Sequence, residues 1–328
     1  MNTKIQLAHT FDDIVSLDNL LAAWQEFIKG KRNKKDVQEF QLRLMDNLIA
    51  LHGDLATGRY HHSGYQAFKI SDPKPRDIHK ANVRDRLVHH AIYRILYPFF
   101  DRVFVADSYS CRLDKGTHKA LARFRKFAHI VSKNNSRTCW ILQGDIRKFF
   151  ASIDHEILKR ILTENIPDKR ILWLLNEVID SFDRGLPLGN LTSQLLVNIY
   201  MNKFDQFIKH KLKARYYIRY ADDFVILSDN RSRLADQIEF SNDFLTKELK
   251  LTLHPDKAHI KSLASGVDFL GWVNFPDHRV LRTKTKRRMF KRLRINLKPE
   301  SVNSYLGLLS HGNTHKIQMQ IANLSDIC

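Results

Sequence analysis

The segment YYIRYADDFVIL at residues 216–227 constrains the fold of this chain more than any other feature. Two runs of aromatic and β-branched residues flank Ala221-Asp222-Asp223, and this pattern predicts two antiparallel strands joined by a tight turn. The turn would carry two carboxylates at its tip. An isolated Asp-Asp pair is usually only a solvated turn, because Asp favours turn positions.

A second acidic site occurs earlier in the chain, where WILQGDI at 140–146 predicts a buried strand that ends at Asp145. Carboxylates at the ends of adjacent strands can hold two Mg²⁺ ions about 4 Å apart. Such a pair activates a 3′-hydroxyl and stabilises the leaving pyrophosphate in nucleotidyl transfer. Asp145 and Asp222-Asp223 are therefore candidate metal ligands.

The remaining patterns predict helices and strands in irregular alternation, which indicates an α+β or mixed α/β domain. Helical spacing predicts two helices over 17–55, joined by the basic turn KGKRNKK, and further helices over 84–100 and 192–212. A helix that Asp154 would cap is expected from about 157, and a strand from Tyr65 to the prolines 73 and 75. Residues 282–298 hold nine Lys/Arg and no acid, and they predict a small helical module from about 281.

The net charge limits the class of partner. The chain has 54 Lys+Arg against 35 Asp+Glu, a formal charge of +19, which favours a polyanion such as nucleic acid. With 43% hydrophobic residues, a disordered chain is excluded. No stretch approaches the ~20 apolar residues of a spanning helix, and the N-terminal residues lack a signal-peptide pattern. Widely spaced cysteines fit reduced thiols, so we expect a cytoplasmic protein without a membrane partner.

Arg219-Tyr220-Ala221-Asp222-Asp223-Phe224 resembles the YxDD box of reverse transcriptases, and further blocks follow in that family's order. Residues 144–155 resemble its first palm block, and 73–76 with 84–88 resemble its fingers block. The resemblance implies an α+β right-hand polymerase fold with fingers, a palm of antiparallel sheet plus helices, and a small thumb. It divides the chain into an N-terminal helical extension (1–60), fingers and palm (61–280) and a basic helical thumb (281–328).

The resemblance also implies roles for individual residues. Asp145, Asp222 and Asp223 would be catalytic and, with Ile146, would bind two Mg²⁺ ions, with Mn²⁺ as a substitute. Phe150 would exclude a ribose 2′-hydroxyl by contact, although its position also suits a core side chain. The nucleotide-binding set is Lys74, Arg76, Arg112, Phe150, Leu188, Gly189 and Lys257, and the template/primer-binding set is Ser193, Gln194, Gly271, Trp272, Lys286, Arg287, Arg288, Lys291 and Arg292.

The block at 185–194, GLPLGNLTSQ, is similar to the G-N-x-x-S-Q form of diversity-generating retroelement reverse transcriptases. In most bacterial relatives a Gln stands where this chain has Leu188. The resemblance implies dNTPs as substrates, a template-repeat RNA and its RNA–DNA hybrid as partners, cDNA with errors at adenines, and a pentameric basic accessory protein. Leucine supplies shape but no hydrogen bond, which is consistent with weaker discrimination; drift in a faithful polymerase is the alternative for this residue.

Other functions remain open from the sequence. A retron, group II intron or phage-defence reverse transcriptase would share the same blocks, although the retron strings N-A-x-x-H and V-T-G do not occur. A non-catalytic RNA-binding protein on the same scaffold would not need the three aspartates. His311 and His315 have zinc-like spacing, but Gly312-Asn313 predicts a turn there, so we reject a zinc site. His61-His62 and His89-His90 are interpreted as surface or RNA-facing residues.

Overall fold

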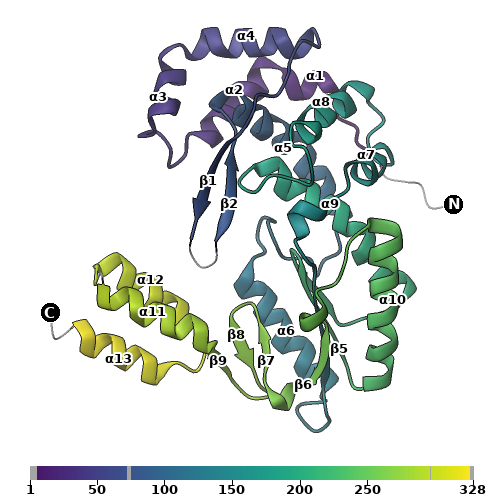
Figure 1. Ribbon diagram of the computed structural model, residues 1–328, viewed down its shortest axis with the longest axis vertical. Coiled ribbons are helices and arrows are strands. Elements are labelled where there is room, and N and C mark those ends of the chain that lie inside the picture. The colour runs from purple at the N-terminus through teal and green to yellow at the C-terminus, as the bar shows by residue number, and fades with distance from the viewer. Residues whose placement is uncertain (1–5, 72–74, 296, 326–328) are drawn as a thin grey trace. The chain divides into compact units, whose positions relative to one another are not determined.

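The computed structural model describes residues 6–71, 75–295 and 297–325 (Figure 1). Its contacts divide the chain into two compact units, each built from separate segments. The first unit comprises residues 1–106, 146–207 and 243–252, and the second comprises 107–145, 208–242 and 253–328. The division into N-terminal extension, fingers with palm, and thumb stays a prediction.

The first unit is mainly helical, with one two-stranded antiparallel hairpin. Its elements are α1 (Phe11–Val15), α2 (Leu17–Phe27), α3 (Lys35–Leu42), α4 (Leu44–Ala56), β1 (Gln66–Ile70), β2 (Arg76–Lys80), α5 (Val83–Val103), the 3₁₀ turn η1 (Phe149–Ser152), α7 (His155–Thr163), α8 (Lys169–Asp180) and α9 (Leu191–Gln206). Helix α5 packs against α2 and α9, and its buried side chains form much of the contact. Asp154 caps α7 as predicted, since its carboxylate accepts the backbone N–H of Ile157 at 3.0 Å.

The second unit combines two antiparallel sheets with helices. Its elements are α6 (Thr117–Val131), β3 (Trp140–Asp145), β4 (Tyr217–Tyr220), β5 (Asp223–Ser228), the 3₁₀ turns η3 (Pro255–Lys257) and η4 (Leu263–Ser265), β6 (His259–Ser262), β7 (Val267–Phe269), β8 (Trp272–Asn274), β9 (Arg279–Leu281), α11 (Thr283–Ile295), α12 (Pro299–Leu309) and α13 (His315–Ser325). A π-helical turn, η2 (Phe207–Lys211), and α10 (Arg231–Leu249) each cross between the two units.

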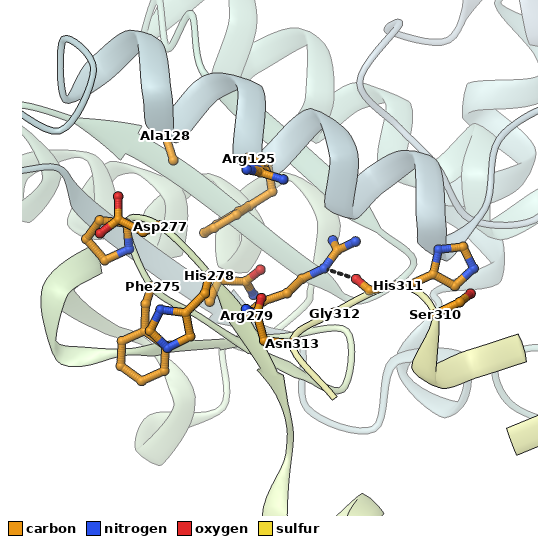
Figure 2. Close-up of a pocket in the computed structure, with 13 residues that line it drawn as sticks. Arg125, Ala128, Phe275, Asp277, His278, Arg279, Ser310, His311, Gly312 and Asn313 are labelled. Atoms are coloured by element: carbon orange, nitrogen blue, oxygen red, sulfur yellow. Dashed lines mark hydrogen bonds between the residues drawn. The ribbon is translucent and has the colours of Figure 1, made fainter. Parts of the chain in front are cut away.

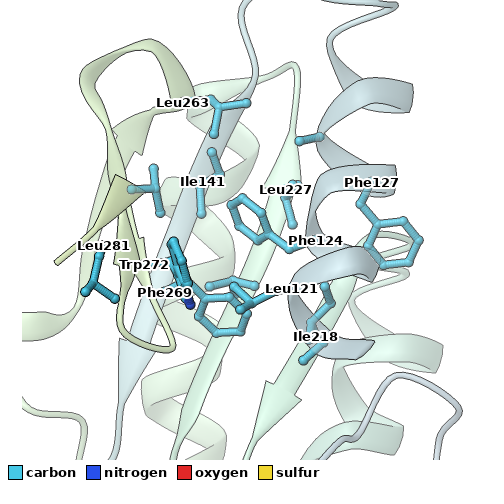
Figure 3. Close-up of a cluster of buried hydrophobic side chains, with 14 of the residues drawn as sticks. Leu121, Phe124, Phe127, Ile141, Ile218, Leu227, Leu263, Phe269, Trp272 and Leu281 are labelled. Carbon is cyan, nitrogen blue, oxygen red and sulfur yellow. The ribbon is translucent and has the colours of Figure 1, made fainter. Parts of the chain in front are cut away.

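One sheet of the second unit has the strand order β4-β5-β3-β6, and the other has β7-β8-β9. Both are antiparallel. Helix α6 packs on β4 and β5 through Leu121 and Phe124, which lie in one hydrophobic cluster with Ile141, Phe269 and Trp272 (Figure 3). The cluster joins the two sheets to α11 through Met289 and Leu293, so the aspartate-bearing strands rest on a continuous core.

Two expectations about helices need correction. The second N-terminal helix is two helices, because Arg43 leaves the helical region at φ −123° and ψ 42°. Phe40, Leu42 and Leu44 are spaced by two, which places them on different sides of a helix, and Leu42 is 85% exposed. The helix expected over 192–212 begins at Leu191 and changes to π geometry from Phe207.

Within the described residues, no helix is long and apolar enough to cross a lipid bilayer. The cytoplasmic location stays a prediction.

Candidate active site

Three carboxylates gather at one edge of the β4-β5-β3-β6 sheet. Strand β3 ends at Asp145, strand β5 begins at Asp223, and these two residues are direct cross-strand partners. Tyr220 pairs with Asp223 across the hairpin, so Ala221 and Asp222 form its two-residue turn. Opposed residues of an antiparallel pair have Cα atoms about 5 Å apart. The predicted hairpin and the predicted strand end therefore meet.

Local packing explains why the sheet edge is so compact. Gly144 lies opposite Phe224, and a Cβ atom at Gly144 would lie 2.2 Å from the Phe224 ring. Only glycine therefore allows the strands to pair with that ring in place. The following residues of β5, from Phe224 to Leu227, are buried. The apolar run after the aspartates thus anchors β5 in the core. Asp223, the first residue of β5, remains exposed at the sheet edge.

Arg219 supports the turn from inside the unit, a role that the sequence analysis missed. Its side chain is fully buried, and it donates from Nη1 to the carbonyl of Ala221 at 3.0 Å and from Nη2 to Oγ of Ser108 at 3.1 Å. Ala221 has a φ of +55°, a left-handed conformation that costs energy for a residue with a side chain. The sequence feature that could have revealed this role is the position of Arg219, a charged residue inside an apolar strand shortly before the aspartates.

Lys257 lies beside the carboxylates. Its ammonium group contacts both carboxylate oxygens of Asp145, at 2.9 Å for Oδ2. The backbone N–H of His254 also donates to the carbonyl of Asp145 at 2.7 Å, which fixes η3 against the end of β3. The predicted proximity of Lys257 to the reaction centre is consistent with this position, although its role towards a nucleotide stays a prediction.

Asp223 is a carboxylate with strongly perturbed acidity. Its pKa is raised to about 7, first by desolvation and then by the charges of Asp222 and Asp145, while Lys257 and Arg282 oppose the shift. Neighbouring carboxylates that repel one another in this way form a site that favours a cation. The repulsion arises because the pairing of β3 with β5 brings these carboxylates together.

The donor set fits Mg²⁺, which prefers carboxylate oxygens and binds through one or two of them plus waters and substrate phosphates. Among the described residues, no three His, Cys, Asp or Glu side chains form a complete metal cluster. An ion would therefore need Asp145 together with Asp222 or Asp223, and Lys257 would have to release Asp145 in part. The side chain of Ile146 is buried, so only its carbonyl could serve as a ligand.

The raised pKa of Asp223 predicts a pH effect on stability. Between about 3.8 and about 7, the folded protein binds a proton at Asp223 that the unfolded chain has lost, so the free energy of unfolding falls as pH rises through this window. We expect the Tm of metal-free protein to fall less steeply in Asp223→Asn than in wild type. Differential scanning fluorimetry in EDTA measures this. Asp243→Asn, an exposed residue on α10, is the control, and equal slopes for wild type and Asp223→Asn would contradict the shift.

The second unit also contains the predicted primer-binding residues. Leu270 and Gly271 form a two-residue turn between β7 and β8, both with positive φ (51° and 88°). Trp272 is 1% exposed and its side chain packs in the core, while its role in template or primer binding stays a prediction. Arg112, which was predicted to bind the nucleotide, also lies in this unit. It is half-buried and donates to the carbonyl of Ser108 at 3.1 Å.

Helix α11 separates its apolar and cationic residues as an amphipathic helix does. Met289 and Leu293 are buried against the core. The cations predicted to bind template or primer lie on the rest of its surface. Arg287, Lys291 and Arg292 are exposed, and Lys286 and Arg288 are half-buried. Lys286, Arg287 and Lys291 line one groove along the helix with Phe290.

The first unit connects its predicted nucleotide-binding residues through the backbone. The N–H of Leu186 donates to the carbonyl of Phe150 at 2.8 Å, and the N–H of His79 in β2 donates to the carbonyl of Leu188 at 3.0 Å. Gly189 has a φ of +112°, and a Cβ there would lie 2.9 Å from Ile78. The turn that carries Leu188 is thus tied to both the Phe150 segment and the hairpin.

The other predicted residues of this unit differ in exposure. Arg76 is exposed at the start of β2, and Phe150 and Gln194 are half-buried. Lys74 lies outside the described residues. Ser193 is 2% exposed within α9, and its role in template or primer binding stays a prediction.

Two of the four paired histidines are buried, contrary to expectation. His62 and His89 face each other with their Nε2 atoms 3.0 Å apart, and Nδ1 of His89 lies 2.6 Å from Oγ1 of Thr192 in α9. Both side chains are 1% exposed. Burial in this polar network satisfies their ring nitrogens, and the sequence offered no periodic signal for it.

Comparison with known proteins bears on the whole arrangement. Residues 70–273 match the family described as "Reverse transcriptase (RNA-dependent DNA polymerase)". Protein YkfC of Escherichia coli (strain K12) is 27% identical over 290 residues, which cover 75% of this chain and 74% of YkfC. The group II intron-encoded protein LtrA of Lactococcus lactis subsp. cremoris is 22% identical over 316 residues, which cover 74% of this chain and 50% of LtrA.

Among solved structures, telomerase from Candida albicans in complex with a fragment of telomeric RNA has a TM-score of 0.50 at 12% identity. The match covers 74% of this chain and 52% of the telomerase chain, and this likeness bears on the fold alone. The predicted α+β right-hand polymerase fold is confirmed. The chain spans about three quarters of YkfC, but only about half of LtrA and of the telomerase chain.

Proposed function

The chain belongs to the reverse transcriptase (RNA-dependent DNA polymerase) family, and from this membership we propose that it copies an RNA template into DNA from dNTPs. The observation that carries the proposal is the pairing of Asp145 with Asp223 at the sheet edge, beside Asp222 in the turn. Binding of polyanions alone gives no reason to gather carboxylates at one point.

Mg²⁺ bound there would activate the primer 3′-hydroxyl and stabilise the leaving pyrophosphate, and Mn²⁺ would substitute. Asp145 and Asp222 would hold the ions, with Asp223 assisting. The contact from Arg219 to the Ala221 carbonyl keeps the turn in its left-handed conformation, so it orients Asp222. Lys257, which already neutralises Asp145, would move its charge towards the incoming phosphates.

Two residues of the first unit would select the nucleotide. Arg76, together with Lys74 from the sequence pattern, would hold the triphosphate, since fixed positive charge and bidentate geometry suit phosphate oxygens. The half-exposed ring of Phe150 would exclude a 2′-hydroxyl by contact. On α11, the cations would follow the backbone of an RNA–DNA hybrid.

A primer-extension assay on RNA tests the proposal. Wild-type protein with Mg²⁺, dNTPs and a DNA primer annealed to RNA should extend the primer, and EDTA should abolish extension. A primed DNA of the same sequence is the comparison template. Absence of product on RNA under all metal conditions would favour a non-catalytic RNA-binding protein on this scaffold.

For the biological template, we propose a template-repeat RNA of a diversity-generating retroelement, with a pentameric basic accessory protein as partner. Support comes from the G-N-x-x-S-Q block and from Leu188 at its apolar position. A group II intron-type role is the second candidate, and the similarity to LtrA favours it. Retron and phage-defence types share the same catalytic residues.

The substitution Leu188→Gln tests the mutagenic part of this proposal. Glutamine can hydrogen-bond the nucleotide sugar, and one hydrogen bond is worth about 0.5–1.5 kcal/mol, so misincorporation opposite template adenine should fall by about two- to tenfold. Sequencing of cDNA made by both enzymes on one RNA measures this. Leu188→Met is the matched control, because it keeps an apolar side chain of similar size. Equal error spectra for wild type and Leu188→Gln would remove Leu188 as the cause of errors.

A further inference from the structure

A cavity of about 360 Å³ lies in the second unit between α6, the turn that joins β8 to β9, and the segment between α12 and α13 (Figure 2). The turn at 275–278 is at the opposite end of β8 from Gly271. None of the residues assigned above to catalysis, nucleotide binding or template and primer binding lines this cavity. Its size is within the range of small-molecule sites.

Two guanidinium groups face the cavity. Arg125 of α6 is exposed at its mouth, and Arg279 of β9 is held by a hydrogen bond from its Nε to the carbonyl of His311. The Arg279 guanidinium also lies over the Trp272 ring, 5.5 Å from its centroid. Partial burial lowers the pKa of Arg279, and the charge of Arg125 lowers it further.

Over the described ranges, neither Arg125 nor Arg279 forms an ion pair with a carboxylate, whereas Arg123 and Arg282 each do. Asp277 lies at the rim, where its Oδ1 accepts a hydrogen bond from Asn135 at 2.8 Å. Two guanidinium groups that repel each other across a cavity suit a phosphate, which binds both and removes the repulsion.

The same cavity offers flat and polar contacts for a base. Phe275 and His278 stack with ring centroids 4.8 Å apart and an interplanar angle of 13°, and both line the cavity. Asn313 and the Asp277 carboxylate provide hydrogen-bonding groups at the mouth. An aromatic platform beside positive charge is the usual construction of sites for single-stranded nucleic acid.

We propose that this cavity binds one nucleotide of a single-stranded RNA segment, with its phosphate at Arg125 and Arg279 and its base against Phe275 and His278. The proposal extends the template-binding surface beyond the polymerase site and rests on the proposed RNA template. A free mononucleotide has the same chemistry. A strand fits better because Arg125, Asp277 and His278 are exposed, so the chain on either side of the bound unit has an open path.

Binding of a short fluorescent RNA, without dNTPs or Mg²⁺, tests the proposal independently of catalysis. Arg125→Gln should weaken binding about tenfold, and it should reduce the slope of log K against log salt by about 0.7, the value for one phosphate contact with a single strand. Lys126→Gln is the matched control: it removes one exposed charge from the next position of the same helix, and Lys126 does not line the cavity. Its affinity should change much less.

His278→Ala separates stacking from charge. The imidazole is assigned to the base and not to the phosphate, so this variant should weaken binding by about fivefold or more through lost stacking and leave the salt slope unchanged. Thermal melting of each variant establishes that it is folded.

Two results would overturn the proposal. If Arg125→Gln and Lys126→Gln lose equal affinity, the cavity contributes only to the general positive field. If AMP binds wild type, Arg125→Gln abolishes that binding, and RNA affinity is unchanged, the cavity takes a free nucleotide and the strand assignment is wrong. A protein that binds RNA in this way but extends no primer would refute the polymerase function and leave the cavity assignment standing.

Discussion

Replacing Asp222 and Asp223 together with alanine is expected to lower Mg²⁺-dependent DNA synthesis on primed RNA by about a thousandfold or more. Metal ions stabilise transition-state charge by several kcal/mol, and each 1.36 kcal/mol corresponds to a tenfold change in rate. The double variant leaves only Asp145, which Lys257 already neutralises. Primer extension followed over time by gel electrophoresis measures the loss.

A loss of folding would not explain that result. Asp222 raises the pKa of Asp223, so the two carboxylates repel each other, and their removal relieves a repulsion in the metal-free protein. We therefore expect an unchanged or higher Tm. Asp236→Ala,Asp243→Ala removes two exposed carboxylates from α10 and is the charge-matched control. Wild-type synthesis by the Asp222→Ala,Asp223→Ala protein would exclude these residues as metal ligands.

Replacing Phe150 with valine is expected to lower the preference for deoxynucleotides over ribonucleotides by about 10- to 100-fold. Small changes in side-chain volume at an apolar contact alter discrimination on this scale. The ring is well placed for such a role, because it is half-exposed and packs edge-on against Phe149 with centroids 5.5 Å apart. The carbonyl of Phe150 is also fixed by the Leu186 N–H, so the backbone should stay in place when the side chain is shortened.

Single-nucleotide insertion kinetics measure the effect as the ratio of kcat/KM for dCTP and CTP opposite template G. Phe150→Tyr, which keeps the bulk of the ring, is the control and should retain discrimination. An unchanged ratio in Phe150→Val, with normal dCTP insertion, would show that the ring is a packing residue. That outcome would restore the alternative of a core phenylalanine.

Much of the sheet edge that carries the three aspartates could be predicted because its signals are local. The alternation of apolar residues, the end of the apolar run at Asp145 and the Ala221-Asp222 turn each depend on a few neighbouring residues. The same holds for the Asp154 cap. These features do not depend on distant parts of the chain, since strand and turn preferences act between residues that are close in the sequence.

Other features could not be predicted, because burial depends on the partner segment. The burial of the Trp272 side chain depends on α6 and the 310–313 segment, and a Cβ at Gly312 would lie 2.1 Å from its ring. His62 and His89 are polar residues whose burial depends on Thr192, a residue far along the chain. Arg219 occupies the core because Ser108 and the Ala221 carbonyl satisfy its guanidinium.

The sequence by itself determined the three aspartates proposed for catalysis, the hairpin that carries two of them and the positive charge that predicts a polyanion partner. Only the tertiary structure decided that Asp145 pairs with Asp223, that Lys257 contacts Asp145 across 112 positions, and that Arg125 and Arg279 share a cavity. The physical reason is that strand register, ion pairing and cavity shape depend on interactions between segments that are distant in the sequence. These interactions form only when the fold brings the segments together.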